Sequence, residues 1–283
     1  MTQEKTKTKP ADIFVDIQAH IESGRFIRDT SLNVQDIRDF VFKDADLRDC
    51  KDILDLGCSY GFFIKGLAGR LHPDAQINGV DLWQGCEEHY ITACRKSFYT
   101  GYFCLSDKVF CNRYPDESFD LVLCSYALYF FPEAIPEIAR VLRPNGLFIT
   151  VTHTVPHMQE LIDIIKKLLE KHTGVPVHSL PLEKLFDSFS SANGFQLLSP
   201  WFREIREKKY MNSLQINCDS LPGLINYLCF KKPLFFPDDC KLDTRFIKSV
   251  VADYLRELLV RQEFLTISKN DTVYICQYPL PAK

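Results

Sequence analysis

The chain has 283 residues, of which 46% are hydrophobic and 25% charged, and this suits one large or two small globular domains with ample core. Its formal net charge of −3 gives no global attraction to nucleic acid. Basic residues form no run longer than the short cluster at 206–209. The composition therefore argues against a nucleic-acid-binding protein.

The N-terminal region is predicted to begin with a disordered tail, because residues 1–10 are polar and rich in lysine. These residues lack the apolar segment of a signal peptide. Two helical segments follow, at about 11–27 and 33–42, where apolar side chains recur at helical spacing.

The stretch 53–68 combines a short strand, a glycine loop and a predicted helix. The strand is apolar apart from Asp55, and 57–61 supply the small residues of a tight turn. Such a corner binds nucleotides at a helix N-terminus. A dinucleotide loop would have glycine at the positions that Ser59 and Phe62 occupy. The charge of Asp55 would oppose a pyrophosphate and favour a cation, so the loop suits a cationic nucleoside better.

At these residues the chain resembles the class I S-adenosylmethionine-dependent methyltransferases. Their first motif is an acid followed by a loop of two or three glycines, and Asp55, Gly57 and Gly61 match it with Ser59 in the middle position. The resemblance implies S-adenosylmethionine as the cofactor, and a tight turn in another α/β protein is the alternative. The cofactor-binding residues that it implies in this loop are Asp55, Gly57, Cys58, Ser59, Tyr60 and Gly61.

The second strand is predicted to end at Asp81, which follows Gly57 by 24 positions. This is close to the spacing of an acid that accepts hydrogen bonds from ribose hydroxyls, and the resemblance implies that role. A helix cap or turn former is the other interpretation. Leu82 is expected to lie against the adenine. After a third strand at 101–106, the family often has an acid that binds the adenine amino group; Asp107 fills this role or is a surface aspartate.

A fourth strand is predicted over 118–124, where the sequence matches the family closely. Ser125 and Tyr126 then lie at its carboxyl end, where ligands bind in doubly wound sheets. Many relatives carry histidine where Tyr129 stands, so the chain departs from the family there. Residues 137–152 form a predicted helix, turn and fifth strand that also match the family.

Beyond the fifth strand the resemblance weakens. Helices are predicted at about 161–169 and 181–192, and a sixth strand over 202–211. An insertion at 219–261 is rich in aromatic residues, and the closing run 272–278 has strand composition.

Together these elements predict an α/β fold with a doubly wound, seven-stranded, mostly parallel sheet in the strand order 3-2-1-4-5-7-6. The family places its last strand antiparallel between strands five and six. The expected domains are a tail at 1–10, N-terminal helices at 11–50, a cofactor-binding domain at 51–218 and 262–283, and a helical lid at 219–261.

The catalytic candidates lie at the expected mouth of the site. Methyl transfer from a sulfonium is an in-line displacement, so the protein mainly aligns the reactants and excludes water. Tyr126, Tyr129 and His153 are the candidates, with His157 nearby. A tyrosine there is more often a wall or a hydrogen-bonding group than a base. His153 either touches the substrate or is a loop residue, and a general base is needed only if the nucleophile arrives protonated.

The predicted function is methyl transfer from S-adenosylmethionine to a small-molecule acceptor, at oxygen or nitrogen. The insertion is similar to that of the small-molecule and carboxylate methyltransferases of the trans-aconitate and malonyl-carrier type. An RNA or protein methyltransferase is one alternative, which the acidic balance disfavours. A non-catalytic binding protein is the other, and the intact acids at positions 55 and 81 argue against it.

The insertion at 219–261 is expected to be a movable cover over an apolar pocket above Tyr126 and Tyr129, because its aromatic side chains must bury against something. The N-terminal helices are expected to contribute to this cover or to pack on the sheet edge. A rigid side domain or a dimer interface is the alternative for the insertion, and a monomer and a homodimer both stay open.

The eleven cysteines form no C-x-x-C pair and no pattern with zinc-ligand spacing, so no metal is predicted. No run reaches the roughly 18 apolar residues of a membrane span. These features predict a reduced, cytoplasmic protein with a small-molecule substrate and without a nucleic-acid or membrane partner.

Overall fold

The computed structural model describes residues 10–106 and 113–280. The predicted tail, up to residue 9, and the predicted adenine ligand Asp107 lie outside the described residues. The chain divides into two compact units, and each is considered by itself below. The sheet unit consists of Asn33–His157, Leu185–Asn212 and Lys269–Lys283, and the helical unit of Met1–Leu32, Met158–Lys184 and Ser213–Ser268.

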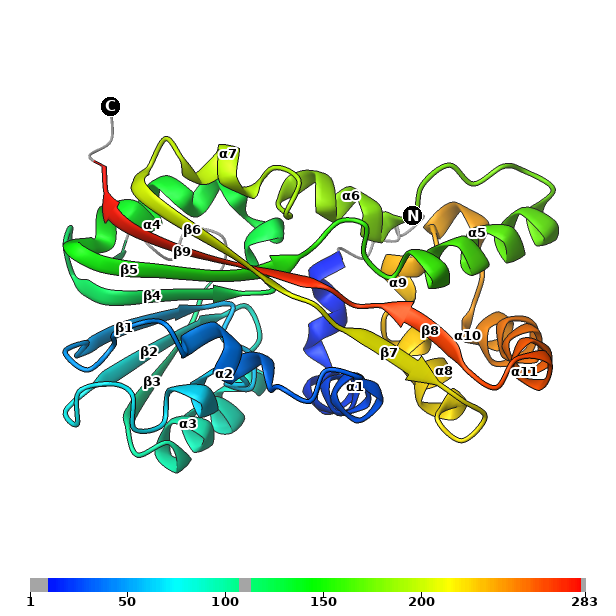
Figure 1. The fold of residues 1–283 in the computed structure, drawn as a ribbon, viewed down its shortest axis with the longest axis horizontal. Helices are drawn as coiled ribbons and strands as arrows, with labels where there is room; N and C mark the ends of the chain where they lie inside the picture. Colours follow the sequence, from blue (N-terminus) through cyan, green and yellow to red (C-terminus); the bar gives the residue numbers. More distant parts are fainter. Residues whose placement is uncertain (1–9, 107–112, 281–283) are drawn as a thin grey trace, which may run out of the picture. The chain divides into compact units, whose positions relative to one another are not determined.

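The sheet unit is built on one large sheet (Figure 1). Within the described residues, seven strands follow the order β3-β2-β1-β4-β5-β9-β6. The strand β9 is antiparallel to both of its neighbours, and the pairs from β3 to β5 are parallel. Since β9 is the seventh strand of this sheet along the chain, the predicted order and its antiparallel last strand are confirmed. The strands are β1 Asp52–Leu56, β2 Gln76–Asp81, β3 Thr100–Leu105, β4 Phe119–Ser125, β5 Leu142–His153, β6 Phe202–Tyr210 and β9 Asp271–Pro279.

Both faces of this sheet are buried. Successive residues of its central strands are apolar, so each strand presents apolar side chains to both faces. In β1, Ile53 belongs to the hydrophobic cluster on one face and Leu54 to that on the other. Neighbouring residues of β9 divide in the same way, with Ile275 on the first face and Tyr274 on the second. Since successive side chains of a strand point to opposite faces, such strands need cover on both sides.

Helices supply that cover on each face (Figure 1). The first cluster includes apolar residues of α2, η2 and α3, and the second those of α4 and α7. This is the predicted doubly wound arrangement. The helical elements that lie wholly in the sheet unit are α2 Ile37–Phe42, η2 Ile64–Leu67, η3 Gln84–Cys86, α3 Glu87–Lys96, η5 Leu128–Phe130, η6 Pro132–Ala134, α4 Ile135–Val141 and α7 Gly194–Leu198.

The segment after the glycine loop differs from the sequence-based prediction. A helix that contains Phe62, Phe63 and Leu67 was expected after the loop, but the structure has only the short 3-10 helix η2 Ile64–Leu67. Two glycines explain the difference. A Cβ at Gly66 would lie 2.7 Å from the Cβ of Arg38, so the turn is packed tightly there, and Gly69 has a φ of +70°, which ends helical geometry.

The helical unit contains most of the remaining helices and a second sheet, in which β7 and β8 pair antiparallel. The predicted insertion at 219–261 lies within this unit, and its boundaries and its role as a lid stay predictions. No helix in the described part of the chain is long and apolar enough to cross a membrane. The elements are η1 Pro10–Val15, α1 Ile17–Thr30, α5 Gln159–Thr173, β7 Ser213–Ile216, α8 Leu221–Phe230, α9 Lys232–Phe235, η7 Asp238–Cys240, α10 Thr244–Phe246, the π-helix η8 Ile247–Val251, α11 Ala252–Arg261 and β8 Leu265–Ser268, while α6 Pro181–Ser188 runs across the division.

Candidate functional site

The glycine loop lies at the carboxyl end of β1 and has the backbone geometry that its residues predict. Gly57, Ser59 and Gly61 have φ values of +67°, +45° and +70°. This left-handed region costs glycine little and suits few other residues. A Cβ at Gly57 would lie 2.5 Å from the Cβ of Ala127. The loop therefore has no room for a side chain at its first position.

Asp81 connects this loop to the end of β2. Its carboxylate accepts hydrogen bonds from the backbone N–H groups of Ser59, at 2.9 Å, and Trp83, at 3.2 Å. Burial raises the pKa of Asp81, and these backbone hydrogen bonds partly offset the effect. The backbone N–H of Leu82 and the thiol of Cys86 also act on this carboxylate as hydrogen-bond donors. The carboxylate is thus held in place beside the loop.

Asp55 is buried in β1, with 4% of its surface exposed. Burial raises its pKa to about 7, the charge of Asp81 acts in the same direction, and the Tyr90 hydroxyl acts against it. That hydroxyl faces Asp55 without a hydrogen bond of regular geometry among the described residues. The pKa of Asp55 is thus close to neutral pH, so a nearby cation would shift it strongly.

The other predicted cofactor residues occupy the same edge of the sheet. Cys58 is buried, Tyr60 and Ser125 are partly buried, and Leu82 is 43% exposed just beyond β2. The exposed position of Leu82 suits an apolar wall for a ligand. The structure brings the loop, Asp81 and Leu82 together by the parallel pairing of β1 with β2.

The predicted catalytic residues form a second group, just after β4 and at the end of β5. Tyr126 has a φ of +55°, and its N–H donates to the carbonyl of Val151 at 2.8 Å. The ring of His153 stacks on those of Tyr126 and Tyr129, with centroids 5.2 and 5.6 Å away. Burial raises the pKa of Tyr126 well above its usual value, and the charge of Asp271 adds to this. At neutral pH Tyr126 is therefore a phenol, which can donate a hydrogen bond but cannot act as a base.

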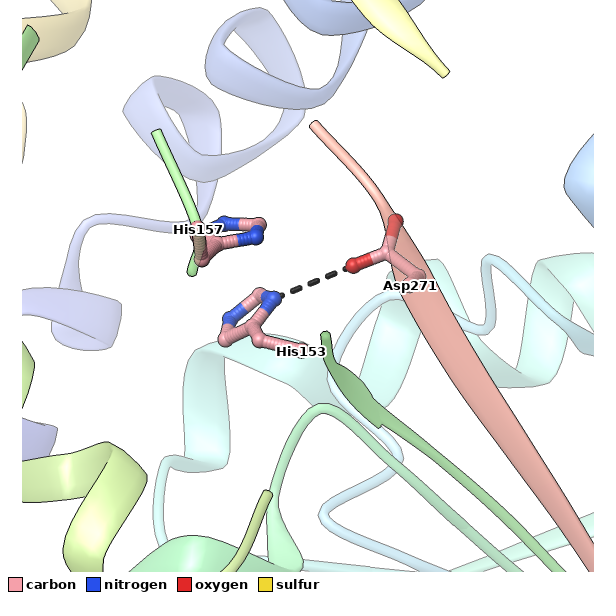
Figure 2. A group of neighbouring side chains, drawn as sticks. All are labelled: His153, His157 and Asp271. Atoms are coloured by element: carbon pink, nitrogen blue, oxygen red, sulfur yellow. Dashed lines mark hydrogen bonds and ion pairs between the residues drawn. The ribbon is translucent and has the colours of Figure 1, made fainter. Parts of the chain in front are cut away.

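His153 is joined to an aspartate that sequence reasoning did not select (Figure 2). Its Nδ1 lies 3.1 Å from Oδ1 of Asp271, and the two residues are register partners in β5 and β9. The ammonium of Lys269 donates to both oxygens of Asp271, at 2.9 and 2.8 Å. Burial raises the pKa of Asp271, but Lys269 and His153 outweigh it and hold that pKa well below its usual range.

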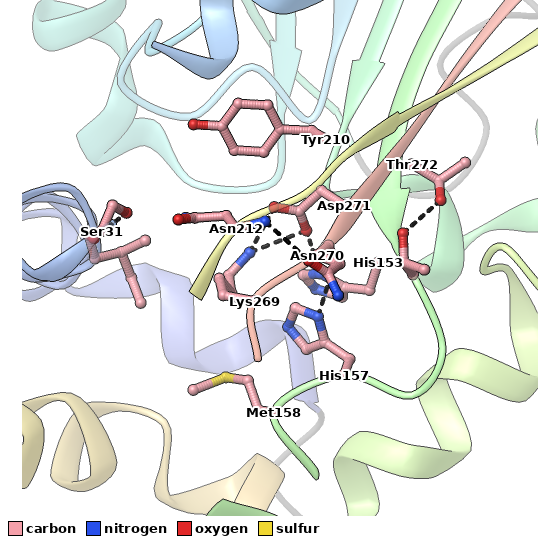
Figure 3. Close-up of polar contacts among 12 residues, drawn as sticks. Ser31, His153, His157, Met158, Tyr210, Asn212, Lys269, Asn270, Asp271 and Thr272 are labelled. Atoms are coloured by element: carbon pink, nitrogen blue, oxygen red, sulfur yellow. Dashed lines mark hydrogen bonds and ion pairs between the residues drawn. The ribbon is translucent and has the colours of Figure 1, made fainter. Parts of the chain in front are cut away.

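His157 completes this group. Its ring centroid is 3.9 Å from that of His153, and its Nδ1 lies 3.2 Å from the carbonyl oxygen of Asn270 (Figure 3). Burial lowers the pKa of His157 well below its usual value, and the charges of His153 and Lys269 act in the same direction. His157 is therefore a neutral imidazole. We refer to His153, His157, Lys269 and Asp271 as the imidazole cluster.

The sequence contained a signal for Asp271 that was not used. The family resemblance predicted that the last strand is antiparallel and adjacent to the fifth. In that arrangement the first residue of the last strand lies opposite the final residue of the fifth, which places Asp271 beside His153. Lys269 and Tyr90 have no comparable signal, because a single lysine or tyrosine is common in any sequence.

Fold and loop together define a class of protein, namely a doubly wound α/β protein that binds a nucleoside-containing cofactor where its central strands end. The residues present fit S-adenosylmethionine. The loop at Gly57 has no room for a side chain, and the carboxylate of Asp81 lies beside the loop, where it accepts the Ser59 N–H.

Comparison with known proteins identifies a methyltransferase domain within the chain. Residues 54–150 match the methyltransferase domain family. Over 119 residues the chain is 38% identical to the uncharacterised methyltransferase YcgJ of Bacillus subtilis, covering 41% of this chain and 47% of that protein. Over 138 residues it is 30% identical to the uncharacterised methyltransferase-like C25B8.10 of Schizosaccharomyces pombe, covering 48% of this chain and 51% of that protein. The chain thus spans about half the length of each of these relatives.

A solved structure supports the fold alone. A methyltransferase candidate from Bacillus halodurans C-125 superposes with a TM-score of 0.52 at 11% identity, covering 86% of this chain and 99% of that one. The domain that contains residues 54–150 belongs to the class I S-adenosylmethionine-dependent methyltransferase superfamily, as predicted, and S-adenosylmethionine is the cofactor of that superfamily.

Proposed function

We propose that the whole protein transfers a methyl group from S-adenosylmethionine to a small-molecule acceptor. The observation that carries this proposal is the coupling of the glycine loop to Asp81, whose carboxylate accepts the Ser59 N–H at 2.9 Å. This bond holds the loop and the ribose-binding acid in one fixed arrangement. The cofactor supplies a methyl group on a positively charged sulfur, and the protein has to bind, orient and dehydrate it.

The loop residues have distinct parts in this proposal. The backbone at Gly57 and Gly61 allows close approach of the cofactor, and Asp81 accepts hydrogen bonds from the ribose hydroxyls. Asp55 would face the cationic end of the cofactor. Because its pKa is about 7, it can become fully ionised when a cation arrives. The predicted contacts of Leu82, Ser125 and Asp107 stay predictions.

The acceptor is proposed to be a small molecule that is methylated at oxygen or nitrogen. The rings of Tyr126, Tyr129 and His153 lie together just after β4 and at the end of β5, and a site with aromatic walls suits a compact acceptor. The net charge of −3 disfavours an RNA acceptor.

Calorimetry with S-adenosylhomocysteine and with NAD tests the cofactor assignment. We expect binding of the former and no binding of the latter. Binding of NAD together with no binding of S-adenosylhomocysteine would contradict the proposal.

Incubation with methyl-labelled cofactor and a metabolite extract, followed by separation of products by size, tests the acceptor class. Label that appears in macromolecules and not in small molecules would refute the small-molecule acceptor.

The movable cover predicted for residues 219–261 is tested separately. Hydrogen exchange with and without S-adenosylhomocysteine should show protection of this segment that depends on the ligand. Equal protection in both states, or protection that follows protein concentration, would favour a rigid side domain or a dimer interface.

A further inference from the structure

The imidazole cluster contains two histidines whose protonation is determined by their neighbours (Figures 2 and 3). Nδ1 of His157 faces the carbonyl oxygen of Asn270, and Nδ1 of His153 faces the carboxylate of Asp271. Both oxygens accept hydrogen bonds and donate none, since Asp271 is held ionised. Each Nδ1 therefore carries a proton, and in a neutral ring Nε2 is then the proton-accepting nitrogen.

The charges of the cluster distinguish between two possible roles, metal binding and proton transfer. Possible ligand atoms of His153, His157 and Asp271 all lie within 4.8 Å of one another, and such a group can hold a divalent metal. Asp271, however, is 2% exposed and already compensated by Lys269, which donates to both of its oxygens. A divalent cation would add two positive charges that no further carboxylate of the cluster balances. The charge balance favours proton transfer over metal binding.

We propose that His153 is the general base of the methyl transfer, with Asp271 as its positioning residue and Lys269 as the counterion of Asp271. This assignment rests on the proposed function and adds to it a reaction step and an acceptor class. His153 is the member suited to this role, because its side chain is 15% exposed and lies against Tyr126 and Tyr129, whereas His157 is 2% exposed.

The proposed step balances in atoms and charge. With an O–H acceptor, Nε2 of His153 takes the proton while an electron pair of oxygen forms the bond to the methyl carbon. With a neutral amine, the nitrogen lone pair forms that bond, and Nε2 of His153 takes a proton from nitrogen, where the electron pair of the N–H bond stays. The carbon–sulfur bond breaks with its electron pair going to sulfur, so the positive charge of the sulfonium reappears on the imidazolium. The carboxylate of Asp271 faces Nδ1 of that imidazolium and stabilises its positive charge. The proton then leaves to solvent.

This step defines the class of acceptor. An alcohol, a phenol or an amine brings the proton that His153 removes. A carboxylate brings none, and its lone pairs would meet the accepting Nε2 atom of His153. The cluster therefore favours acceptors with an O–H or N–H group over carboxylates, in contrast to the carboxylate methyltransferases that the insertion resembles.

The pH dependence follows from the groups that surround His153. Among the described residues, the groups that face it include Tyr126 and Tyr129 after β4, His157 after β5, Phe186 of α6, Lys269 before β9, and Asp271 of β9. Among them, Tyr126 is a neutral phenol and His157 a neutral imidazole near pH 7, while Lys269 and Asp271 form an ion pair. The transfer rate is expected to rise with pH and level off as His153 loses its proton.

Nitrogen NMR on protein labelled with 15N-histidine tests the protonation without any acceptor. The expected spectrum shows His153 and His157 with protonated Nδ1 and unprotonated Nε2. The Asp271→Asn variant should alter the His153 signals and leave those of His157 in place. Protonation of His153 on Nε2 in the wild type would overturn the assignment, and so would a stoichiometric zinc or iron content that the His157→Ala variant lacks.

Label transfer tests the chemistry, with phenol, ethanolamine, benzoate and a metabolite extract as acceptors. His153→Gln should lower the transfer rate by about 10²–10⁴-fold and change the dissociation constant of S-adenosylhomocysteine less than about twofold. The matched control is His89→Gln, because His89 is an exposed histidine on α3. Imidazole added to His153→Ala should restore part of the rate, which a merely structural histidine would not allow.

The two hypotheses fail in different ways. If His153→Gln binds S-adenosylhomocysteine and transfers label at more than about a tenth of the wild-type rate, the general-base assignment is wrong and the proposed function stands. Preferential labelling of benzoate would also refute the assignment. If the wild type neither binds S-adenosylhomocysteine nor transfers label, the proposed function fails, while the nitrogen spectra still decide the protonation of the cluster.

Discussion

The sheet unit contains two buried acidic sites whose electrostatics are opposite. Asp55, beside the glycine loop, has a pKa raised to about 7 by burial, and the pKa of Asp81 is raised as well. Asp271, in the imidazole cluster, is as deeply buried, yet its pKa lies well below its usual range. The difference is Lys269, which donates to both oxygens of Asp271. Burial alone makes a carboxylate easier to protonate, and a partner of opposite charge reverses the effect.

The two sites also differ in function. The carboxylates of the glycine-loop corner are suited to respond to an incoming cation, because no cation within residues 10–106 and 113–280 compensates them in the way that Lys269 compensates Asp271. The carboxylate of the imidazole cluster keeps a constant charge and can hold a histidine in one orientation. In the proposed reaction, the first site receives the cofactor and the second removes a proton from the acceptor.

The largest effect is expected from Lys269→Met. This change leaves the 2% exposed carboxylate of Asp271 without its counterion and should lower the free energy of unfolding by about 3–5 kcal/mol near pH 7. Because the folded pKa of Asp271 is depressed, its contribution to stability is present above the unfolded value of 3.8 and is lost as pH falls through the folded pKa. Urea unfolding measures both effects.

The double variant Lys269→Met/Asp271→Asn is the control for this prediction. It removes both charges and should recover more than half of the lost stability. Equal destabilisation in the single and double variants would show that Lys269 acts through packing, and the electrostatic contrast with Asp55 would then be wrong.

The next largest effect is expected from Asp81→Ala. Loss of two charge-assisted hydrogen bonds to ribose hydroxyls should weaken binding of S-adenosylhomocysteine by about 2–4 kcal/mol, which is roughly 30–900-fold. Calorimetry measures the dissociation constant, and thermal unfolding checks that the variant folds. An unchanged dissociation constant would show that Asp81 only forms the turn with Ser59 and Trp83.

Asp55→Asn is expected to change the pH dependence of stability. The folded pKa of about 7 lies above the unfolded value of 3.8, so the contribution of Asp55 is fully present below the unfolded value and is lost as pH rises through the folded one. The wild type should therefore lose about 2–4 kcal/mol relative to Asp55→Asn between roughly pH 4 and pH 8. Urea unfolding at both pH values measures this, and parallel pH profiles would refute the raised pKa.

The smallest effect is expected from a pair of glycine variants. Gly57 and Gly69 have φ values of +67° and +70°, but a Cβ at Gly57 would lie 2.5 Å from that of Ala127, while nothing lies within 4 Å at Gly69. Gly69→Ala should cost about 1 kcal/mol of stability from backbone strain, and Gly57→Ala about 1–2 kcal/mol more from crowding. Equal losses in urea unfolding would show that the loop can relax away from Ala127.

Much of the fold could be predicted because its information is local. Strands such as β1 and β4 are nearly continuous apolar runs, which parallel strands buried on both faces require. The glycine loop could be recognised because its residues are adjacent in the chain and the backbone conformation favours their types, as the positive φ does at Gly57. The family resemblance added the strand order, including the antiparallel strand that is now β9. The short turn at Ile64–Leu67 in place of a helix was missed, because the effect of Gly66 depends on a side chain from α2.

The sequence by itself determined the class of the protein, its cofactor corner and the candidate residues at the ends of β4 and β5. Only the tertiary structure decided what those candidates can do. His153 and Asp271 are 118 residues apart and meet because β9 returns antiparallel beside β5. Burial and Lys269 then determine the charge of Asp271, and that charge determines the proton position on His153. A local pattern can specify a backbone turn, but the protonation of a side chain depends on neighbours that only the folded chain brings together.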